Sequence, residues 1–236
     1  MKHNKNKKKN KNIPPIKNLE DITEKEQIKQ IEVTKYITQA FTTLTGNPRL
    51  FIPDEIHKTP LRIYKAYKEL FECAINHYKL PATTTHNPDE NSDTTSLTTT
   101  FNTTYNGIVA HINIPIASVC AHHFLPYFGY AHLFYIPNKK KLGLSKIPRL
   151  IRYLAHQPSS QEELTDFIID KLDEILKSKG IMLIIECIHT CEAIRGVKIN
   201  NAITITSAVR GVFRTNNNAR LEALSIYEQS KTKLSI

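Results

Sequence analysis

The chain has 236 residues, of which 40% are hydrophobic, enough for one sizeable domain with its own core or for one domain with an arm. No stretch approaches the roughly 18 consecutive apolar residues of a membrane span, and four cysteines are too few for a disulfide scaffold. Residues 1–12 lack the apolar segment of a secretory signal. We therefore expect a protein of the reducing cytoplasm without a membrane partner.

The net charge of +10 is concentrated near the N-terminus, because residues 1–12 contain six lysines and no acidic residue. We expect residues 1–20 to form a disordered basic tail. The alternative is a segment that contacts nucleic acid or another polyanion. No Phe, Tyr or Trp lies among these lysines to stack on bases, so we favour the solvated tail and do not expect a nucleic-acid partner.

Two helices are predicted after this tail. Apolar residues at spacings of three and four predict a helix over 24–45, and Gly46 ends it. A second helix begins near Thr59, which can cap it, with Pro60 at the first helical position.

A polar segment separates these helices from the rest of the chain. Residues 82–104 are rich in Thr, Asn, Asp and Ser, which indicates a loop with a short strand near 96–101. The predicted organisation is therefore a disordered tail, a helical region ending in the Thr-rich loop, and a catalytic domain, at residues 1–20, 21–100 and 101–236.

An amphipathic helix is predicted over 159–179. Ser160 and Glu163 fit a capping box at its start, and Gly180 suits its C-terminal turn. Alternating or continuous apolar runs predict strands on both sides of this helix. Strands and helices in this order indicate an α+β fold, an antiparallel sheet with helices on one face. The predicted strands lie in 108–116, 130–136, 181–189 and 201–209.

Two Cys/His groups could meet at one metal ion. Cys120 and His123 are spaced as C-x-x-H, and His189 and Cys191 as H-x-C at the end of a predicted strand. Alternate residues of a strand face the same side, so both members of the second group can point into one cleft. A catalytic zinc has three protein ligands and an open position, whereas a structural zinc has four. The surplus histidines, His122 among them, favour a hydrolytic site that needs acids and bases, although a structural zinc or buried thiols remain open.

A second group of residues suits an anion. Ser145 can begin a helix that carries Lys146 and Arg149 at its N-terminal end, and such helix ends bind phosphates. An ordinary capped helix with exposed bases is the alternative. Arg195 lies four residues after Cys191. Gln161 and Glu162, in the first turn of the capped helix, either serve the helix dipole or bind a polar heterocycle.

Six motifs together resemble the GTP cyclohydrolase I family, in order and in spacing. The resemblance covers about residues 25–230, and the basic tail lies outside it. The motifs are K-T-P-L-R at 58–62, C-A-H-H-F-L-P at 120–126, G-L-S-K-I-P-R at 143–149, Q-E-E-L-T at 161–165, E-C-I-H-T-C-E-A-I-R-G-V at 186–197 and T-S-A-V-R-G-V-F-R at 206–214.

The resemblance implies a role for each matching residue. Cys120, His123 and Cys191 would bind one Zn²⁺ per subunit, and His122 and His189 would be the catalytic histidines. Gln161 and Glu162 would bind guanine. The triphosphate would be held by Ser145, Lys146, Arg149 and Arg195. Arg62 from a neighbouring subunit would add to this group.

The resemblance also implies a fold, an assembly and a reaction. The fold would be the tunnelling fold (T-fold) with an N-terminal helical arm, and the chain would form a homodecamer of two pentameric rings with active sites at subunit interfaces. The reaction would open the guanine ring of GTP at C8, release formate and re-close to 7,8-dihydroneopterin triphosphate, at the entrance to folate or pterin synthesis.

Three residues depart from the family pattern. Ala121 stands where glutamate is usual, Glu163 where arginine is usual, and Ile199 where lysine is usual, although Lys198 is adjacent. None of them removes a ligand or a proton carrier, so they affect rate and affinity more than reaction type. Two rivals stay open: a catalytically silent paralogue acting as a binding or regulatory scaffold, for which Ala121 is the support, and a nucleic-acid-binding protein with a structural zinc.

Overall fold

The structure, a computed structural model, describes residues 19–53, 56–80 and 97–233. Its contacts divide the chain into two units, residues 1–67 and 68–236, and each is described by itself. Residues 1–18 of the predicted tail and 82–96 of the Thr-rich loop lie outside the described residues. The predicted boundary between residues 100 and 101 stays a prediction.

The described part of the first unit is mainly helical. Helix α1 (Leu19–Thr45) begins five residues before the predicted start and ends as predicted, at Gly46, whose φ of +64° suits glycine. Helix α2 (Thr59–Leu70) carries Pro60 in its first turn, as predicted. The two helices are joined by a hydrogen bond of 3.0 Å from the Tyr64 hydroxyl to Glu26 Oε1.

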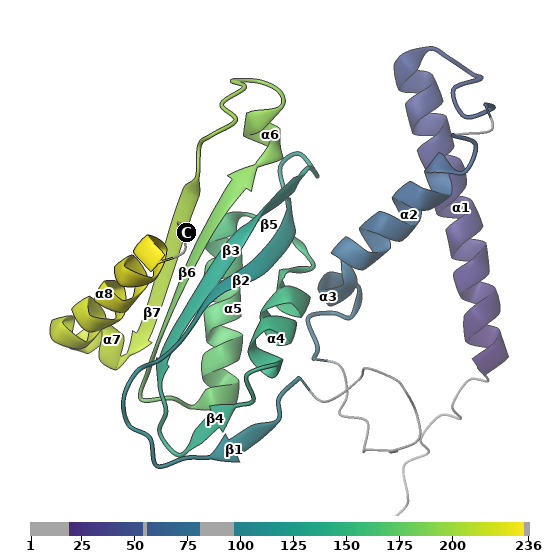
Figure 1. The fold of residues 1–236 in the computed structure, drawn as a ribbon. Coiled ribbons are helices and arrows are strands. Elements are labelled where there is room, and N and C mark those ends of the chain that lie inside the picture. The colour runs from purple at the N-terminus through teal and green to yellow at the C-terminus, as the bar shows by residue number, and fades with distance from the viewer. Residues whose placement is uncertain (1–18, 54–55, 81–96, 234–236) are drawn as a thin grey trace, which may run out of the picture. The chain divides into compact units, whose positions relative to one another are not determined.

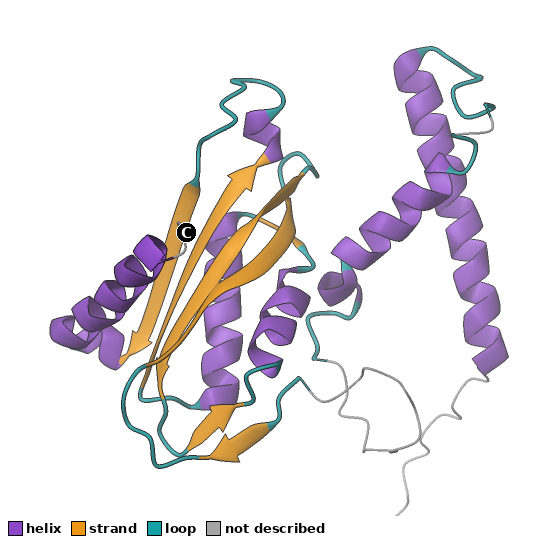
Figure 2. Cartoon of the chain, in the orientation of Figure 1, coloured by secondary structure: helices purple, strands orange, loops and turns teal. Residues whose placement is uncertain are grey.

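The second unit is built on a five-stranded sheet in the order β5-β2-β3-β6-β7 (Figures 1 and 2). Its long strands are antiparallel neighbours, and only the short β5 runs parallel, beside the end of β2. The four predicted strands are confirmed. They are β2 (Val109–Cys120), β3 (Pro126–Ile136), β6 (Gly180–His189) and β7 (Thr204–Gly211), with β5 at Pro158–Ser159.

Helices α4 (Lys146–Ala155) and α5 (Gln161–Leu176) cover one face of this sheet, as predicted. Alternate strand residues such as Leu133 and Leu183 point to them and are fully buried. Short helix α3 (Glu72–Ile75) adds the buried Cys73 to the same core. The remaining strands, β1 (Thr100–Asn102) and β4 (Lys140–Leu142), form a separate two-stranded sheet, and β1 overlaps the predicted short strand.

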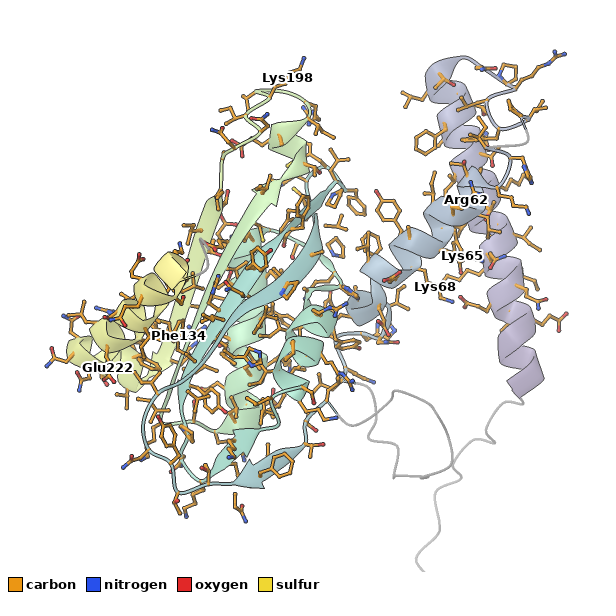
Figure 3. The ribbon with its side chains drawn as sticks, in the orientation of Figure 1. Arg62, Lys65, Lys68, Phe134, Lys198 and Glu222 are labelled. Carbon is orange, nitrogen blue, oxygen red and sulfur yellow. The ribbon has the colours of Figure 1, made fainter. Side chains whose placement is uncertain are left out.

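The opposite face of the sheet carries a second helical layer, which the sequence did not predict. Helices α7 (Val212–Thr215) and α8 (Asn217–Lys233) pack Phe213 and Tyr227 against Phe134 of β3. Figure 3 marks Phe134 beside α8. His132 is 1% exposed on this face and its Nε2 lies 3.3 Å from Glu186 Oε1, so it is a core histidine.

The two ends of α5 differ in how well the sequence predicts them. The Ser160 hydroxyl accepts a hydrogen bond of 3.2 Å from the Glu163 amide, so the predicted N-cap is confirmed. The prediction for Gly180 was wrong, because the left-handed residue after α5 is Lys177, with φ of 46°. Gly180 instead begins β6, where an added Cβ would lie 3.0 Å from the Val212 nitrogen.

No helix in the described part of the chain has the length and apolarity to cross a membrane.

Gly129 lies where β3 and β6 approach closely, and this contact yields a stability prediction. A Cβ at this position would clash with the backbone carbonyl of Glu186. We expect Gly129→Ala to lower the free energy of unfolding by about 1–3 kcal/mol or more, because the two strands must move apart. Gly46→Ala is the control, since no atom lies within 4 Å of its Cβ and only the strain of a positive φ remains. Equal thermal-denaturation midpoints for the two variants would contradict the prediction.

Candidate active site

Segments far apart in the sequence meet at one end of the sheet, where strands β2 and β6 finish. Strand β2 ends at Cys120, and β6 ends at His189, which pairs with Tyr127 of β3. The N-terminus of α5 reaches the same end because Ser159 pairs with Cys120 just before the helix begins. A pocket of about 240 Å³ lies here, lined by Cys120, His122, His123, Ser160, Gln161, Glu162, His189, Cys191, Glu192 and Thr204.

Three of these side chains form a compact group of metal-binding atoms. The ligand atoms of Cys120, His123 and Cys191 all lie within 4.8 Å of one another. A tight turn after β2 makes this possible, since Phe124 donates its amide to the Cys120 carbonyl and adopts a φ of 54°. The Cys120 Sγ lies 3.9 Å from His123 Nδ1 and 3.8 Å from His122 Nδ1.

The donor set fits a zinc ion. Two thiols and one imidazole are ligands that zinc prefers, and three protein ligands leave a position open. Burial and the neighbouring Cys120 raise the pKa of the Cys191 thiol. A divalent cation between the two sulfurs would reverse that effect, because a coordinating thiol loses its proton.

The other two cysteines belong to the core. Burial raises the pKa of Cys73 to about 11, and burial with the nearby Glu186 raises the pKa of Cys187 to about 12. Both therefore remain protonated, inert thiols. The four free cysteines thus separate into two core residues and two that line the pocket.

His189 is held in place by two contacts. Its ring stacks on that of Tyr127, with the centroids 4.5 Å apart and the planes at 11°. Its Nε2 lies 2.8 Å from Gln161 Oε1. Burial lowers the pKa of His189, while Glu192 and Glu162 oppose this shift, so a neutral imidazole is favoured.

The carboxylate of Glu162 is exposed in the first turn of α5 and lines the pocket. Gln161 beside it is only 1% exposed.

The predicted anion-binding residues do not line this pocket. Helix α4 begins at Lys146 as predicted, but the hydroxyl of Ser145 forms no cap hydrogen bond. The ten residues of α4 rise about 15 Å, and its C-terminal end leads into β5 at the pocket edge. The N-terminus with Ser145, Lys146 and Arg149 therefore lies away from the pocket of its own chain.

The predicted anion-binding group contains two further cations, Arg195 and Arg62. Arg195 follows helix α6 (Thr190–Ala193), and its charge opposes the rise in the pKa of Cys191, so it lies near the metal-binding group. Arg62 lies in the first unit, on the side of α2 that also carries Lys65 and Lys68 (Figure 3). In the same view, Lys198 lies at the tip of the loop after α6, next to the Ile199 departure.

Sequence reasoning missed three pocket residues. Ser160 was assigned only as a helix cap, and Thr204 lies on a strand whose register was unknown. Glu192 directly follows Cys191, and this adjacency to a candidate ligand was the signal that could have found it.

The fold and the pocket together define a class, an α+β enzyme with a Cys/His-lined site at the end of its sheet. The family model for GTP cyclohydrolase I matches residues 52–228. The chain belongs to the GTP cyclohydrolase I family, and its fold is the tunnelling fold, as the resemblance implied.

Similar proteins agree with this assignment. "GTP cyclohydrolase 1" of Campylobacter jejuni strain 81116 is 39% identical over 174 residues, which cover 74% of this chain and 84% of that protein. The Geobacillus kaustophilus protein of the same name is 38% identical over 169 residues, covering 71% and 82%. The "Bifunctional protein FolKE" of Lactococcus lactis is 40% identical over 172 residues, covering 71% of this chain and 44% of that protein.

Proposed function

We propose that the protein opens the guanine ring of GTP at C8 in a zinc-dependent hydrolysis, releases formate and forms 7,8-dihydroneopterin triphosphate, the first step of folate or pterin synthesis. One observation carries the proposal: a Cys/His/Cys group within 4.8 Å lies in one pocket with two further histidines and two carboxylates. A structural zinc would have no use for these additional groups.

Cys120, His123 and Cys191 would hold one zinc ion per chain. When bound, zinc supplies a Lewis acid that makes a water molecule acidic enough to react near neutral pH. The chain supplies the proton carriers. A protonated histidine at guanine N7 would make C8 more electrophilic, and a neutral one would accept a proton, so His122 and His189 can serve successive transfers. The lowered pKa of His189 suits it to the neutral role.

Glu162 would select the base. Guanine presents N1–H and a 2-amino group side by side, and one carboxylate can accept from both. Adenine presents an unprotonated N1 and no 2-amino group, so the carboxylate would lose both partners. A site built on such hydrogen bonds rejects the analogue that lacks them by about 10⁴–10⁵-fold.

The triphosphate would be bound by residues of more than one chain. Ser145, Lys146 and Arg149 lie away from the pocket of their own chain, which supports their use in the pocket of a neighbour. Arg195 and, from another neighbour, Arg62 would add charge. The resulting assembly would be a cytoplasmic homo-oligomer, which we propose to be a decamer with active sites at subunit interfaces.

Incubation with GTP, followed by fluorescence detection of oxidised neopterin, tests the activity directly. Zinc analysis of the same sample distinguishes the rivals. A silent paralogue would bind zinc and assemble without forming neopterin. A nucleic-acid-binding protein with a structural zinc would retain oligonucleotides and leave GTP unchanged.

Glu162→Ala should lose most GTP turnover while zinc stays bound, because guanine is no longer held with C8 at the metal. Glu163→Ala is the matched control, since it removes a neighbouring exposed carboxylate that does not line the pocket. Zinc content, assembly and turnover would be measured together in both variants. Near-normal turnover in an intact, zinc-loaded Glu162→Ala oligomer would remove Glu162 from the guanine site and leave it a helix-terminus charge worth about 0.3–1 kcal/mol.

A further inference from the structure

The side-chain amide of Gln161 is enclosed by hydrogen-bond partners from its own chain. The nitrogen Nε2 lies 3.0 Å from the carbonyl oxygens of Ile185 and Thr204 and 3.1 Å from Thr206 Oγ1, and its two hydrogens are shared among these three acceptors. The oxygen Oε1 faces His189 Nε2 at 2.8 Å. Because Gln161 is 1% exposed, water cannot substitute for these partners.

The number of hydrogens on each group fixes the direction of the hydrogen bonds around Gln161. The Thr165 hydroxyl donates its one hydrogen to the Gln161 backbone carbonyl at 2.7 Å. In the 2.7 Å contact between the two threonine hydroxyls, Thr206 must therefore be the donor. Because the Thr206 hydroxyl donates its one hydrogen to Thr165, Thr206 Oγ1 can only accept a hydrogen bond from Gln161 Nε2.

The amide of Gln161 consequently has one permitted orientation. If it were flipped, its oxygen would face three acceptors, the carbonyls of Ile185 and Thr204 and the Thr206 hydroxyl, with no hydrogen between them. A buried oxygen without a donor is strongly disfavoured, because it loses its hydrogen bonds to water and gains none in the protein. The network therefore fixes the orientation of the Gln161 amide. Oε1 must face His189, and an amide oxygen can only accept.

We propose that Gln161 is a positioning residue that holds neutral His189 with its proton on Nε2, leaving Nδ1 as the nitrogen that takes up and releases the catalytic proton. The role of His189 in proton transfer rests on the proposed function, whereas the position of its resting proton rests on the hydrogen-bond network alone. Tyr127 assists, because its ring stacks on the imidazole and fixes the ring plane. The Tyr127 hydroxyl is itself held 3.2 Å from Ser159 Oγ in the core.

This assignment gives Gln161 a role other than binding guanine. The resemblance places both Gln161 and Glu162 on the base, but the donors and the acceptor of the Gln161 amide already have partners. The carboxylate of Glu162 is exposed at the pocket and is available to the base. The two adjacent residues therefore have different roles: Glu162 would face the substrate, and Gln161 faces His189.

Solid-state NMR of the zinc-loaded protein, labelled with ¹³C and ¹⁵N in histidine, tests the proposal without an activity assay. At mildly alkaline pH we expect the protonated nitrogen of His189 to correlate with Cδ2, which identifies it as Nε2. The spectrum of His189→Asn identifies the signal. A protonated nitrogen that correlates with Cγ instead would overturn the proposal, whether or not the protein turns over GTP.

Two variants of Gln161 provide a matched pair. Gln161→Met and Gln161→Glu both lose the donors to the strand carbonyls, but only glutamate keeps an oxygen within reach of His189. We expect Gln161→Glu to retain the Nε2–H form, and Gln161→Met to lose this preference. In Gln161→Met, kcat should fall about 10²-fold with little change in KM or zinc content, since a misplaced catalytic group costs about this much.

An unchanged tautomer and kcat in Gln161→Met would overturn the positioning role. If either variant fails to fold, the spectrum of the unsubstituted protein still decides the tautomer. Absence of neopterin formation by the unsubstituted protein would refute the proposed function and leave the tautomer result standing.

Discussion

Replacing Cys191 by serine should remove zinc from the protein and abolish turnover. The Cys191 sulfur lies within 4.8 Å of both other ligand atoms, so all three are needed to surround one ion. A hydroxyl is a poor zinc ligand compared with a thiolate. The remaining two ligands would leave the ion mostly to water, and the Lewis-acid chemistry would be lost with it.

Elemental analysis of the purified variant, together with the GTP assay, provides the measurement. Cys187→Ala is the control, because this thiol is buried in the core four residues earlier and takes no part in the pocket. We expect the control to keep one zinc per chain and to lose only stability. Stoichiometric zinc in Cys191→Ser would show that the ligand set is assigned wrongly.

The second large effect is expected for His122→Ala, which should keep zinc and lose turnover by about 10²–10⁴-fold, the usual range for loss of a general acid or base. The distances from Cys120 do not separate the two adjacent histidines, at 3.8 Å and 3.9 Å. Only His123 shares the compact group with Cys191, which supports its role as the ligand.

The companion variant His123→Ala makes this test decisive, because it should lose the metal. Zinc content and single-turnover rates would be measured for both variants. Metal loss in His122→Ala with retention in His123→Ala would mean that the two roles are exchanged.

The parts of the fold that could be predicted are those with strong local patterns. The strands of the sheet have continuous or alternating apolar runs, and the Ser160 cap of α5 follows from residue type and spacing. Helix α8 was missed because its apolar residues are sparse, and its order depends on Ala223 and Tyr227 packing on the sheet. The sequence nevertheless contains a signal for the start of α8, because Asn216 is a typical N-cap residue. Its Oδ1 accepts a hydrogen bond from the amide of Asn218.

The candidate site also has features that the sequence predicts and features that depend on strand pairing. Spacing alone suggested that the thiols and histidines could converge, and the register of β3 against β6 brings them together. The partners of Gln161 could not be predicted, because Ile185 and Thr204 contribute backbone carbonyls whose direction depends on strand pairing. The proposed triphosphate residues would act across chains, and no pattern within one chain encodes such contacts.

The position of the three ligands also bears on how the protein is made. During synthesis, Cys120 and His123 leave the ribosome well before Cys191, and the intervening residues form α4 and α5. The third ligand reaches the first two only after β6 has paired with β3. If the proposed ligand set holds zinc, the nascent chain would have no complete site before this pairing, and zinc would be bound late in maturation, because a preformed site rarely exists in the unfolded state.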